Sequence, residues 1–183
     1  MIIDSKLGEV KVEEQLKGKK ILIVDDEPDV LEVLKEQLEM CIIDTAPSFE
    51  AAKKFLDKNT YDVAILDIMG VRGYELLEIA NQKGIPALML TAHALSPDNL
   101  VKSIKNGAQS YIPKEKMYDI DTFVVDIIKA KEKGSQAYAA WFARLKQFFD
   151  KRFGPNWKEK DKEFWQEFDK KYIASKEELG SIM

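Results

Sequence analysis

Two adjacent carboxylates follow a short apolar run near the start of the chain. Ile21 to Val24 are four apolar residues, and Asp25 and Asp26 come directly after them. Such a run predicts a strand buried on both faces, as in a parallel sheet covered by helices. Ligands of open α/β sheets bind at the carboxyl ends of the strands, and two neighbouring like charges repel unless a cation lies between them. The pair therefore predicts a divalent metal site, and the alternative is that the two acids only cap the next helix, which one Asp could do alone.

Three later segments place polar side chains at the same edge of the predicted sheet. Asp67 ends an apolar run that begins after Tyr61, Thr91 follows the run 86–90, and Lys114 follows the segment 110–113. The carboxyl ends of parallel strands meet at one edge, where open α/β sheets bind their ligands. We therefore expect three acids, one hydroxyl and one lysine to share a rim.

These residues, in this order and at these spacings, resemble the receiver domain of two-component response regulators over about residues 19–130. The resemblance implies that Asp67 is a phosphoacceptor. It also implies a Mg²⁺ site built from Asp26 and Asp67, with Asp25 acting through water and the backbone carbonyl of Met69 as a further ligand. Oxygen ligands of this kind suit Mg²⁺, which is typically held by one or two carboxylates together with phosphate oxygens.

The resemblance further implies that Thr91 and Lys114 contact the phosphoryl group, and that a sensor histidine kinase or a phosphotransfer protein is the donor. An ammonium group and a hydroxyl stabilise the charge on phosphoryl oxygens. A carboxylate is already ionised near neutral pH, so Asp67 needs no base. Tyr111 resembles the aromatic switch residue of the family, which turns inward when the threonine moves toward the phosphoryl group, and His93 stands at the rim.

Two features depart from the family pattern. The loop from Asp67 to Tyr74 is shorter than usual and lacks its proline, and Glu115 stands where many members have a proline after the lysine. These departures support an alternative from another class, a phosphorylation-independent interaction or scaffold module on a receiver fold. The main hypothesis is a two-component response regulator that phosphorylates itself on Asp67 and has no separate catalytic output domain.

The segments alternate between apolar strand patterns and helical patterns. This order predicts an α/β fold of the flavodoxin-like class, with a doubly wound five-stranded parallel sheet in the order 2-1-3-4-5. Strands are expected near 20–25, 41–45, 61–67, 86–91 and 109–112. Helices are expected near 28–40, 48–58, 73–82, 97–106 and 118–133.

Three regions are expected along the chain: an N-terminal arm or added helix at 1–18, the receiver at 19–133, and an aromatic-rich helical extension at 134–183. All three tryptophans lie in the extension. Aromatic residues at helical spacing predict an antiparallel helical hairpin, with one helix at about 135–153 and another at about 157–174. The aromatic residues form one stripe along each predicted helix, and two interpretations of these stripes stay open. Either the stripes pack on each other and on the receiver, or they form a homodimer or partner interface. The stripes are Tyr138, Trp141, Phe142, Leu145, Phe148 and Phe149, then Trp157, Phe164, Trp165, Phe168 and Tyr172.

Composition narrows the class of protein. No segment approaches the length of a membrane span and no targeting signal is visible, so a cytoplasmic protein is expected. Residues 1–128 hold 15 basic and 23 acidic residues, whereas the remaining 55 residues hold 13 and 9. The basic residues of the second part alternate with acids and match no helix-turn-helix or zinc pattern, so the sequence does not favour nucleic-acid binding.

Overall fold

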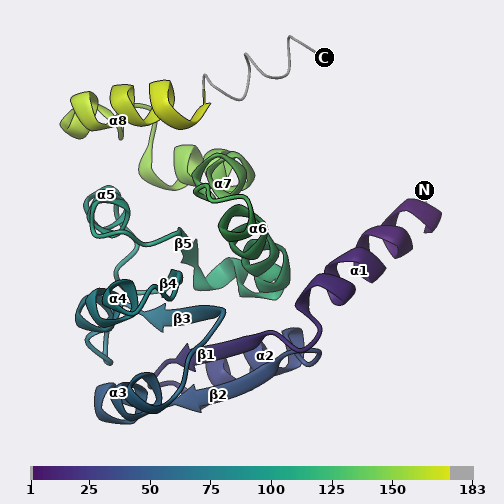
Figure 1. The fold of residues 1–183 in the computed structure, drawn as a ribbon. Helices are drawn as coiled ribbons and strands as arrows, with labels where there is room; N and C mark the ends of the chain where they lie inside the picture. Colours follow the sequence, from purple (N-terminus) through teal and green to yellow (C-terminus); the bar gives the residue numbers. More distant parts are fainter. Residues whose placement is uncertain (1, 174–183) are drawn as a thin grey trace.

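The structure is a computed structural model that describes residues 2–173, with side chains described from residue 6 onward. Five strands form one parallel sheet in the order β2-β1-β3-β4-β5 (Figure 1). This order confirms the predicted fold class. The strands are β1 Lys20–Val24, β2 Ile42–Ala46, β3 Val63–Asp67, β4 Ala87–Thr91 and β5 Ser110–Pro113.

Helices cover both faces of the sheet. One face carries α2 and α6, and the other carries α3, α4 and α5 (Figure 1). Right-handed crossovers between parallel strands produce this two-sided layering. The helices are α2 Pro28–Gln37, α3 Phe49–Lys58, α4 Gly73–Gln82, α5 Pro97–Lys105 and α6 Ile120–Glu132.

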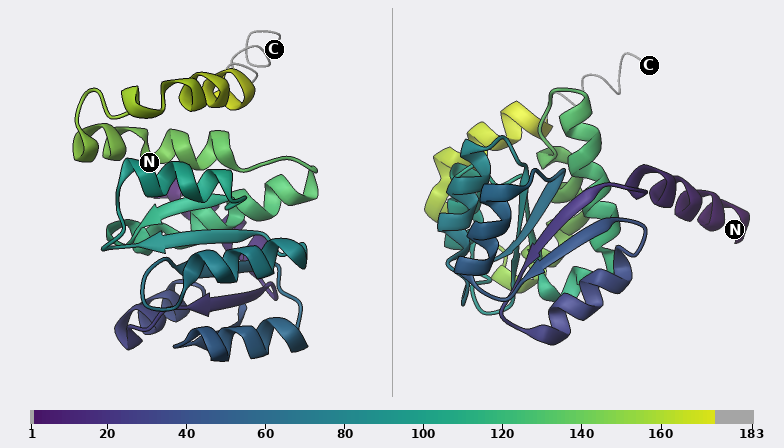
Figure 2. Two further views of the ribbon diagram at one scale, coloured as in Figure 1. Left: turned by 90° about the vertical axis from the view of Figure 1, so that its left-hand side faces the viewer. Right: turned by 60° about the horizontal axis from the view of Figure 1, so that its bottom comes forward.

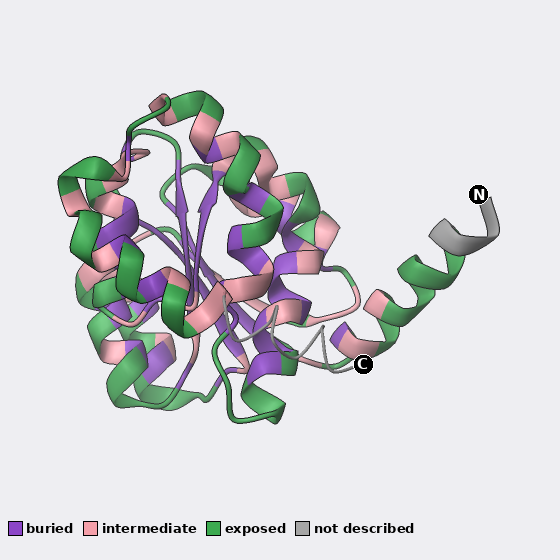
Figure 3. Ribbon diagram, turned by 90° about the horizontal axis from the view of Figure 1, so that it is seen from above, coloured by how far each residue is buried: buried purple, intermediate pink, exposed green. Residues whose placement is uncertain are grey.

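The core lies between the sheet and these helices. Every residue of β3, β4 and β5 is buried, and the strands run through the buried centre of Figure 3. Local signals set the helix ends: the Ser48 and Ser96 side chains accept hydrogen bonds from backbone N–H groups at the starts of α3 and α5. Gly84 and Gly107 adopt φ values of +70° and +86° just after α4 and α5, as expected for helix stops.

The N-terminal segment is a helix, α1 Ile2–Leu16, that projects from the body of the molecule (Figures 1 and 2). Its last residue, Leu16, is fully buried, whereas Leu7 and Val10 are about half exposed, at 54% and 50%. The helix is therefore anchored through its C-terminal end. Among the described residues, no helix combines the length and the apolar character that a membrane span needs.

The C-terminal extension starts with α7 Tyr138–Phe153, which confirms the first predicted helix of the hairpin. Gly154, with φ +91°, ends α7, and the chain then runs back across it (Figure 2). The second predicted helix, at about 157–174, is present as a helical stretch at 159–173 that starts two residues later and changes type along its length, and residue 174 lies outside the described residues. This stretch consists of a 3-10 turn at Glu159–Asp161, the short helix α8 Lys162–Phe168 and a π-helical turn at Asp169–Ile173.

The contacts of Trp157 explain the late start of this helical stretch. Its indole N–H donates a hydrogen bond of 2.9 Å to the Asp150 carboxylate, and its ring lies 5.4 Å from that of Phe153, centroid to centroid. Both partners lie on α7, so the chain turns tightly before α8 begins. The receiver also has a 3-10 segment before an α-helix: η1 Lys114–Asp119 follows β5 and precedes α6.

Candidate functional site

The register of the sheet brings the predicted acids together. Val24 of β1 is paired with Leu66 of β3, so Asp25 and Asp67 come one residue later at the same edge. From β1 the chain first forms β2 on one side of β1 and then crosses to form β3 on the other side. The carboxyl end of β1 is therefore the topological switch point of the sheet. Asp25 is fully buried and Asp67 is 4% exposed.

Lys114 connects the carboxylates. Its Nζ lies 2.8 Å from Asp25 Oδ2, donates a hydrogen bond of 2.8 Å to Glu27 Oε1, and lies 3.5 Å from Asp67 Oδ1. Burial alone would lower the pKa of the Lys114 ammonium, but its contacts with Asp25 and Glu27 outweigh burial and raise that pKa. Lys114 therefore stays charged, and it offsets part of the negative charge that the sheet edge concentrates.

One ammonium group does not neutralise the cluster. Burial, and after it the charge of Asp25, raises the pKa of Asp67 to about 7, although Lys114 acts in the opposite direction. Burial also raises the pKa of Asp25, despite Lys114 and the Glu27 N–H that donates to Asp25 Oδ1 over 2.9 Å. The site therefore has an excess of carboxylate charge that a further cation would relieve.

A group of three acids at this edge has the dimensions of a metal site. Among the described residues, Asp25, Asp26 and Glu27 each offer a carboxylate oxygen, and these oxygens lie within 4.8 Å of one another. Asp25 Oδ2 is buried and lies 2.8 Å from the Lys114 ammonium, which also contacts Glu27 and Asp67. These oxygen donors fit Mg²⁺, which prefers carboxylates and keeps several waters.

Glu27 is the residue that sequence reasoning missed. The only signal was its position directly after the Asp25–Asp26 pair, in a place where an acid also suits the start of α2. Asp67, predicted as a direct ligand, lies outside the three-residue group but close enough for the charges of Asp25 and Asp26 to raise its pKa. Its role as a ligand stays a prediction.

The loop between β3 and α4 closes tightly over the site. Gly70 has φ +84°, and a Cβ atom placed on it would lie 2.4 Å from Asp26 Oδ2. A Cβ atom on Gly73 would lie 2.1 Å from the backbone oxygen of Asp67. The shortened loop thus requires glycine at both positions, because its backbone passes against the two acids. Met69, directly before Gly70, is 55% exposed, and the role of its backbone carbonyl as a ligand stays a prediction.

Thr91 and Tyr111 are tied to the same peptide segment. The Ala94 N–H donates a hydrogen bond of 3.0 Å to Thr91 Oγ1, and the Tyr111 hydroxyl donates one of 2.8 Å to the Ala94 carbonyl. The Tyr111 hydroxyl also accepts a hydrogen bond from the Ser96 N–H at 3.2 Å. Tyr111 is fully buried, so the structure has the inward orientation of this side chain. His93 is exposed near these residues.

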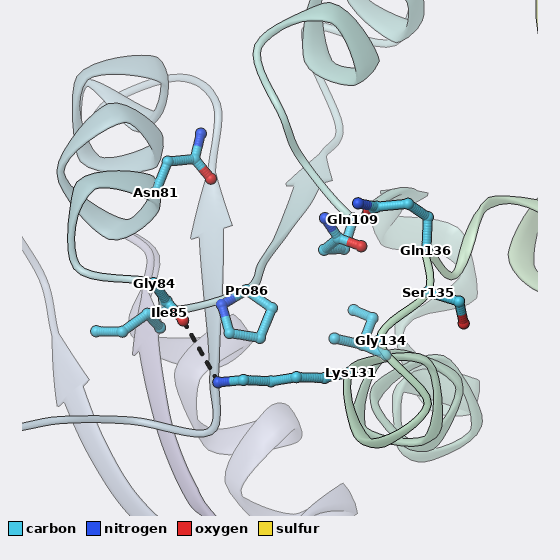
Figure 4. Close-up of a pocket in the computed structure, with 10 residues that line it drawn as sticks. Asn81, Gly84, Ile85, Pro86, Gln109, Lys131, Gly134, Ser135 and Gln136 are labelled. Atoms are coloured by element: carbon cyan, nitrogen blue, oxygen red, sulfur yellow. Dashed lines mark hydrogen bonds between the residues drawn. The ribbon is translucent and has the colours of Figure 1, made fainter.

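A separate pocket lies at the opposite edge of the sheet (Figure 4). It is a hollow of about 310 Å³ at the amino ends of β4 and β5, and Lys131 donates a hydrogen bond to the Gly84 carbonyl beside it. The polar side chains around it are mostly neutral amides, from Asn81, Gln109 and Gln136. This pocket lacks the carboxylate cluster and is distant from the site.

The fold and the site together define a class of protein. A family model described as "Response regulator receiver domain" matches residues 21–125, which is more than half of the chain. The chain belongs to this family, and it carries the receiver domain of a two-component response regulator. The matched region ends before α7, so α7 and α8 lie outside it.

Curated and solved proteins agree with this assignment. The chain is 38% identical over 98 residues to the heme response regulator HssR of Staphylococcus aureus strain Newman, a match that covers 51% of this chain and 43% of that protein. The match therefore spans less than half the length of the relative.

Two solved receiver domains have the same fold. A CheY-like receiver domain from Methanospirillum hungatei JF-1 is 28% identical, with a TM-score of 0.59, and is covered completely by 65% of this chain. A receiver domain from Clostridium thermocellum is also 28% identical, with a TM-score of 0.55, over 62% of this chain and 97% of that one.

Proposed function

We propose that this chain is a Mg²⁺-dependent phosphoacceptor, in which Asp67 receives a phosphoryl group from a sensor histidine kinase or a phosphotransfer protein. The observation that carries the proposal is the setting of Asp67. It ends β3 at the switch point, is only 4% exposed, and lies 3.5 Å from the Lys114 ammonium. A buried carboxylate with a strongly raised pKa beside a charged partner is typical of a functional group.

The neighbouring residues have distinct roles in the transfer. An oxygen of Asp67 attacks the phosphorus, the bond from phosphorus to the donor imidazole nitrogen breaks, and the imidazole keeps the electron pair. Lys114 binds a phosphoryl oxygen. Thr91 Oγ1 accepts a hydrogen bond from the Ala94 N–H, and the Thr91 hydroxyl can still donate its own proton in a hydrogen bond to a second phosphoryl oxygen.

Asp25, Asp26 and Asp67 would hold the metal ion, Asp25 through water and with the Met69 carbonyl as a further ligand. When bound, Mg²⁺ supplies positive charge to the carboxylates and to the phosphoryl oxygens. Support for this ligand set comes from the three-acid group at Asp25, Asp26 and Glu27 and from the charges of Asp25 and Asp26, which help to raise the pKa of Asp67.

The proposed organisation has three parts: an arm at 1–18, a receiver at 19–133 and an extension at 134–183. The family match at 21–125 supports the middle part. The tight turn at Gly134, with φ +65°, supports a boundary between α6 and α7. The last ten residues of the extension, 174–183, lie outside the described residues.

Acetyl phosphate with Mg²⁺ tests the proposal directly. Intact-mass measurement should show one added phosphoryl group on the wild type, labile to hydroxylamine, and none on Asp67→Asn. Asp62→Asn is the matched control, because Asp62 stands at the other end of β3, where its carboxylate accepts the Lys20 N–H at 2.8 Å. Failure of the wild type to label with acetyl phosphate and with a phosphohistidine donor would instead favour a scaffold function.

A further inference from the structure

Helix α1 projects from the receiver and receives little support from the rest of the chain (Figures 1 and 3). Its C-terminal end packs against the core through Val12 and Leu16, and it contacts α6. The helix has 15 residues, one of which is Gly8. Isolated helices of about this length are only marginally stable in water, and an internal glycine weakens them further. A second contact surface along α1 would therefore stabilise its projecting part.

The face of α1 that turns away from the core carries apolar side chains. Leu7 stands nine residues before the buried Leu16, which places it about 180° round the helix from that anchor. Val10 follows Leu7 by three positions, so both side chains lie on one face. Each is about half exposed, although both are large and apolar. An apolar stripe therefore lies on the side of α1 opposite to its anchored side.

Charged side chains flank this stripe in a pattern that discriminates between possible partners. Leu7 and Val10 take the a and d positions of a heptad. Lys6 and Glu13 then fall at g positions on one flank, and Lys11 falls at an e position on the other flank. All three charged residues are exposed. Residues at e and g set the partner and the orientation of paired helices, so these three charges test any arrangement of a second helix.

A second copy of α1 matches the charges in the antiparallel orientation. In a parallel pair, a g residue faces the e residue five positions later on the other helix, so Lys6 would meet Lys11. In an antiparallel pair, g faces g. With Leu7 of one copy over Val10 of the other, Lys6 lies within about 3 Å, along the axis, of Glu13 of the second copy. Two-fold symmetry forms this ion pair twice and places the two receivers at opposite ends of the helix pair.

We propose that α1 is a self-association surface, through which two copies of this chain pair their α1 helices antiparallel with Leu7 and Val10 at the centre. The proposal is independent of the phosphoacceptor function, because α1 precedes the family match and joins the amino end of β1, opposite the carboxylate edge. Two helices of this length overlap over about 22 Å at most. The interface is therefore small, and the dimer belongs to the weak and reversible class.

Sedimentation equilibrium of the full chain, from micromolar to millimolar concentration, measures the association. The expected result for the wild type is a reversible equilibrium between monomer and dimer. The double variant Leu7→Ser/Val10→Ser should raise the dissociation constant at least about ten-fold, because it removes the apolar centre of the interface. Tyr118→Ser is the matched control, since it removes a similarly exposed apolar side chain from η1. It should associate as the wild type does.

Charge reversal tests the orientation. Lys6→Glu and Glu13→Lys each create like charges at the proposed pair, so each should weaken the dimer by about five-fold or more, and their combination should restore it. Each single reversal also suits the helix macrodipole, with an acid nearer the N-terminus or a base nearer the C-terminus. A weaker dimer therefore cannot result from a less stable helix. Glu9→Lys, outside the stripe and its flanks, is the control and should leave the association unchanged.

The outcomes decide the proposal in both directions. A wild type that stays monomeric over the whole range, or an unchanged dimer in Leu7→Ser/Val10→Ser, would overturn it. Tighter association of Lys6→Glu would also overturn it, because a parallel pair predicts that result. Weakening by both single reversals and recovery in their combination would support it. These measurements need no phosphoryl donor, so labelling of Asp67 is decided separately.

Discussion

Tyr111 of β5 and Phe149 of α7 face each other across the boundary between the receiver and its extension. Their ring centroids are 6.2 Å apart at an interplanar angle of 39°, and both side chains are fully buried. The residue that resembles the switch aromatic of the family therefore packs against a segment outside the family match. Among the described residues, the large exposed apolar side chains are Leu7, Val10, Ile42, Met69 and Tyr118, and none comes from the extension.

Truncation of Phe149 should destabilise the whole chain. Phe149→Ala leaves a cavity between α7 and β5, and large-to-small changes of a buried Phe cost about 3–5 kcal/mol. Phe148→Ala, at the neighbouring and only partly buried position, should cost clearly less. Urea unfolding followed by circular dichroism measures both. Equal losses for the two variants would mean that Phe149 is not packed against the receiver.

The stability of the metal-free protein should depend on pH through Asp67. Its pKa is raised from 3.8 to about 7, so the folded protein keeps a proton that the unfolded chain has already released between these values. In that window the unfolded state binds fewer protons, and the stability contributed by this group falls as the pH rises.

Asp67→Asn has no titrating carboxyl group at this position, so it removes the loss of stability that the wild type shows as the pH rises. The variant should therefore gain stability relative to the wild type as the pH rises from about 4 to about 7, by on the order of 2–4 kcal/mol, since one pKa unit corresponds to about 1.4 kcal/mol. Urea titrations without Mg²⁺ at several pH values measure the difference. Asp57→Asn, a half-exposed surface acid, is the control and should show no such trend. A constant difference between Asp67→Asn and the wild type would contradict the raised pKa.

Lys114→Met should have opposite effects on the metal-free and metal-bound protein. Without metal, the change leaves Asp25 and Asp67 buried beside no cation and should cost about 3–5 kcal/mol. Because Lys114 lies 2.8 Å from Asp25 Oδ2, its removal should also strengthen Mg²⁺ binding. Thermal scans and calorimetry measure the two effects, and Lys129→Met on the exposed side of α6 is the control. Weaker Mg²⁺ binding by Lys114→Met would show that the lysine and the metal do not compete.

Gly70→Ala should uncouple Mg²⁺ from stability. A ligand that binds only the folded state adds about 2.7 kcal/mol when its concentration is 100 times its Kd, so Mg²⁺ should raise the Tm of the wild type. A Cβ atom at Gly70 would lie 2.4 Å from Asp26 Oδ2 and displace that carboxylate.

Gly84→Ala provides the matched control. Gly84 also has a positive φ, of +70°, but no atom within 4 Å of the added Cβ, so it carries the same backbone strain without the displaced acid. Both variants should lose about 1–2 kcal/mol without metal, the cost of a left-handed conformation for alanine. Only Gly70→Ala should lose the Mg²⁺-dependent rise in Tm. An equal rise in both variants would mean that Asp26 is not part of the metal site.

Local patterns in the sequence determined the sheet, its strand order and the sharing of one edge by Asp25, Asp67, Thr91 and Lys114. Apolar runs report burial, and parallel strands connected by crossovers have their carboxyl ends at one edge, so the residue that follows each run is placed without knowledge of packing. The first helix of the extension was predictable for a similar reason, since its aromatic residues recur at helical spacing.

Contacts between distant segments were decided only by the tertiary structure. Glu27 joined the site because Lys114, 87 residues later, donates a hydrogen bond to it. The second helical stretch of the hairpin starts later than predicted because the Trp157 indole N–H donates a hydrogen bond to Asp150 on the preceding helix. The extension packs against β5 through the contact between the Phe149 and Tyr111 rings. Periodicity describes how one element is buried, whereas the partner of a side chain depends on how whole elements are oriented, and packing sets that orientation only when the chain is folded.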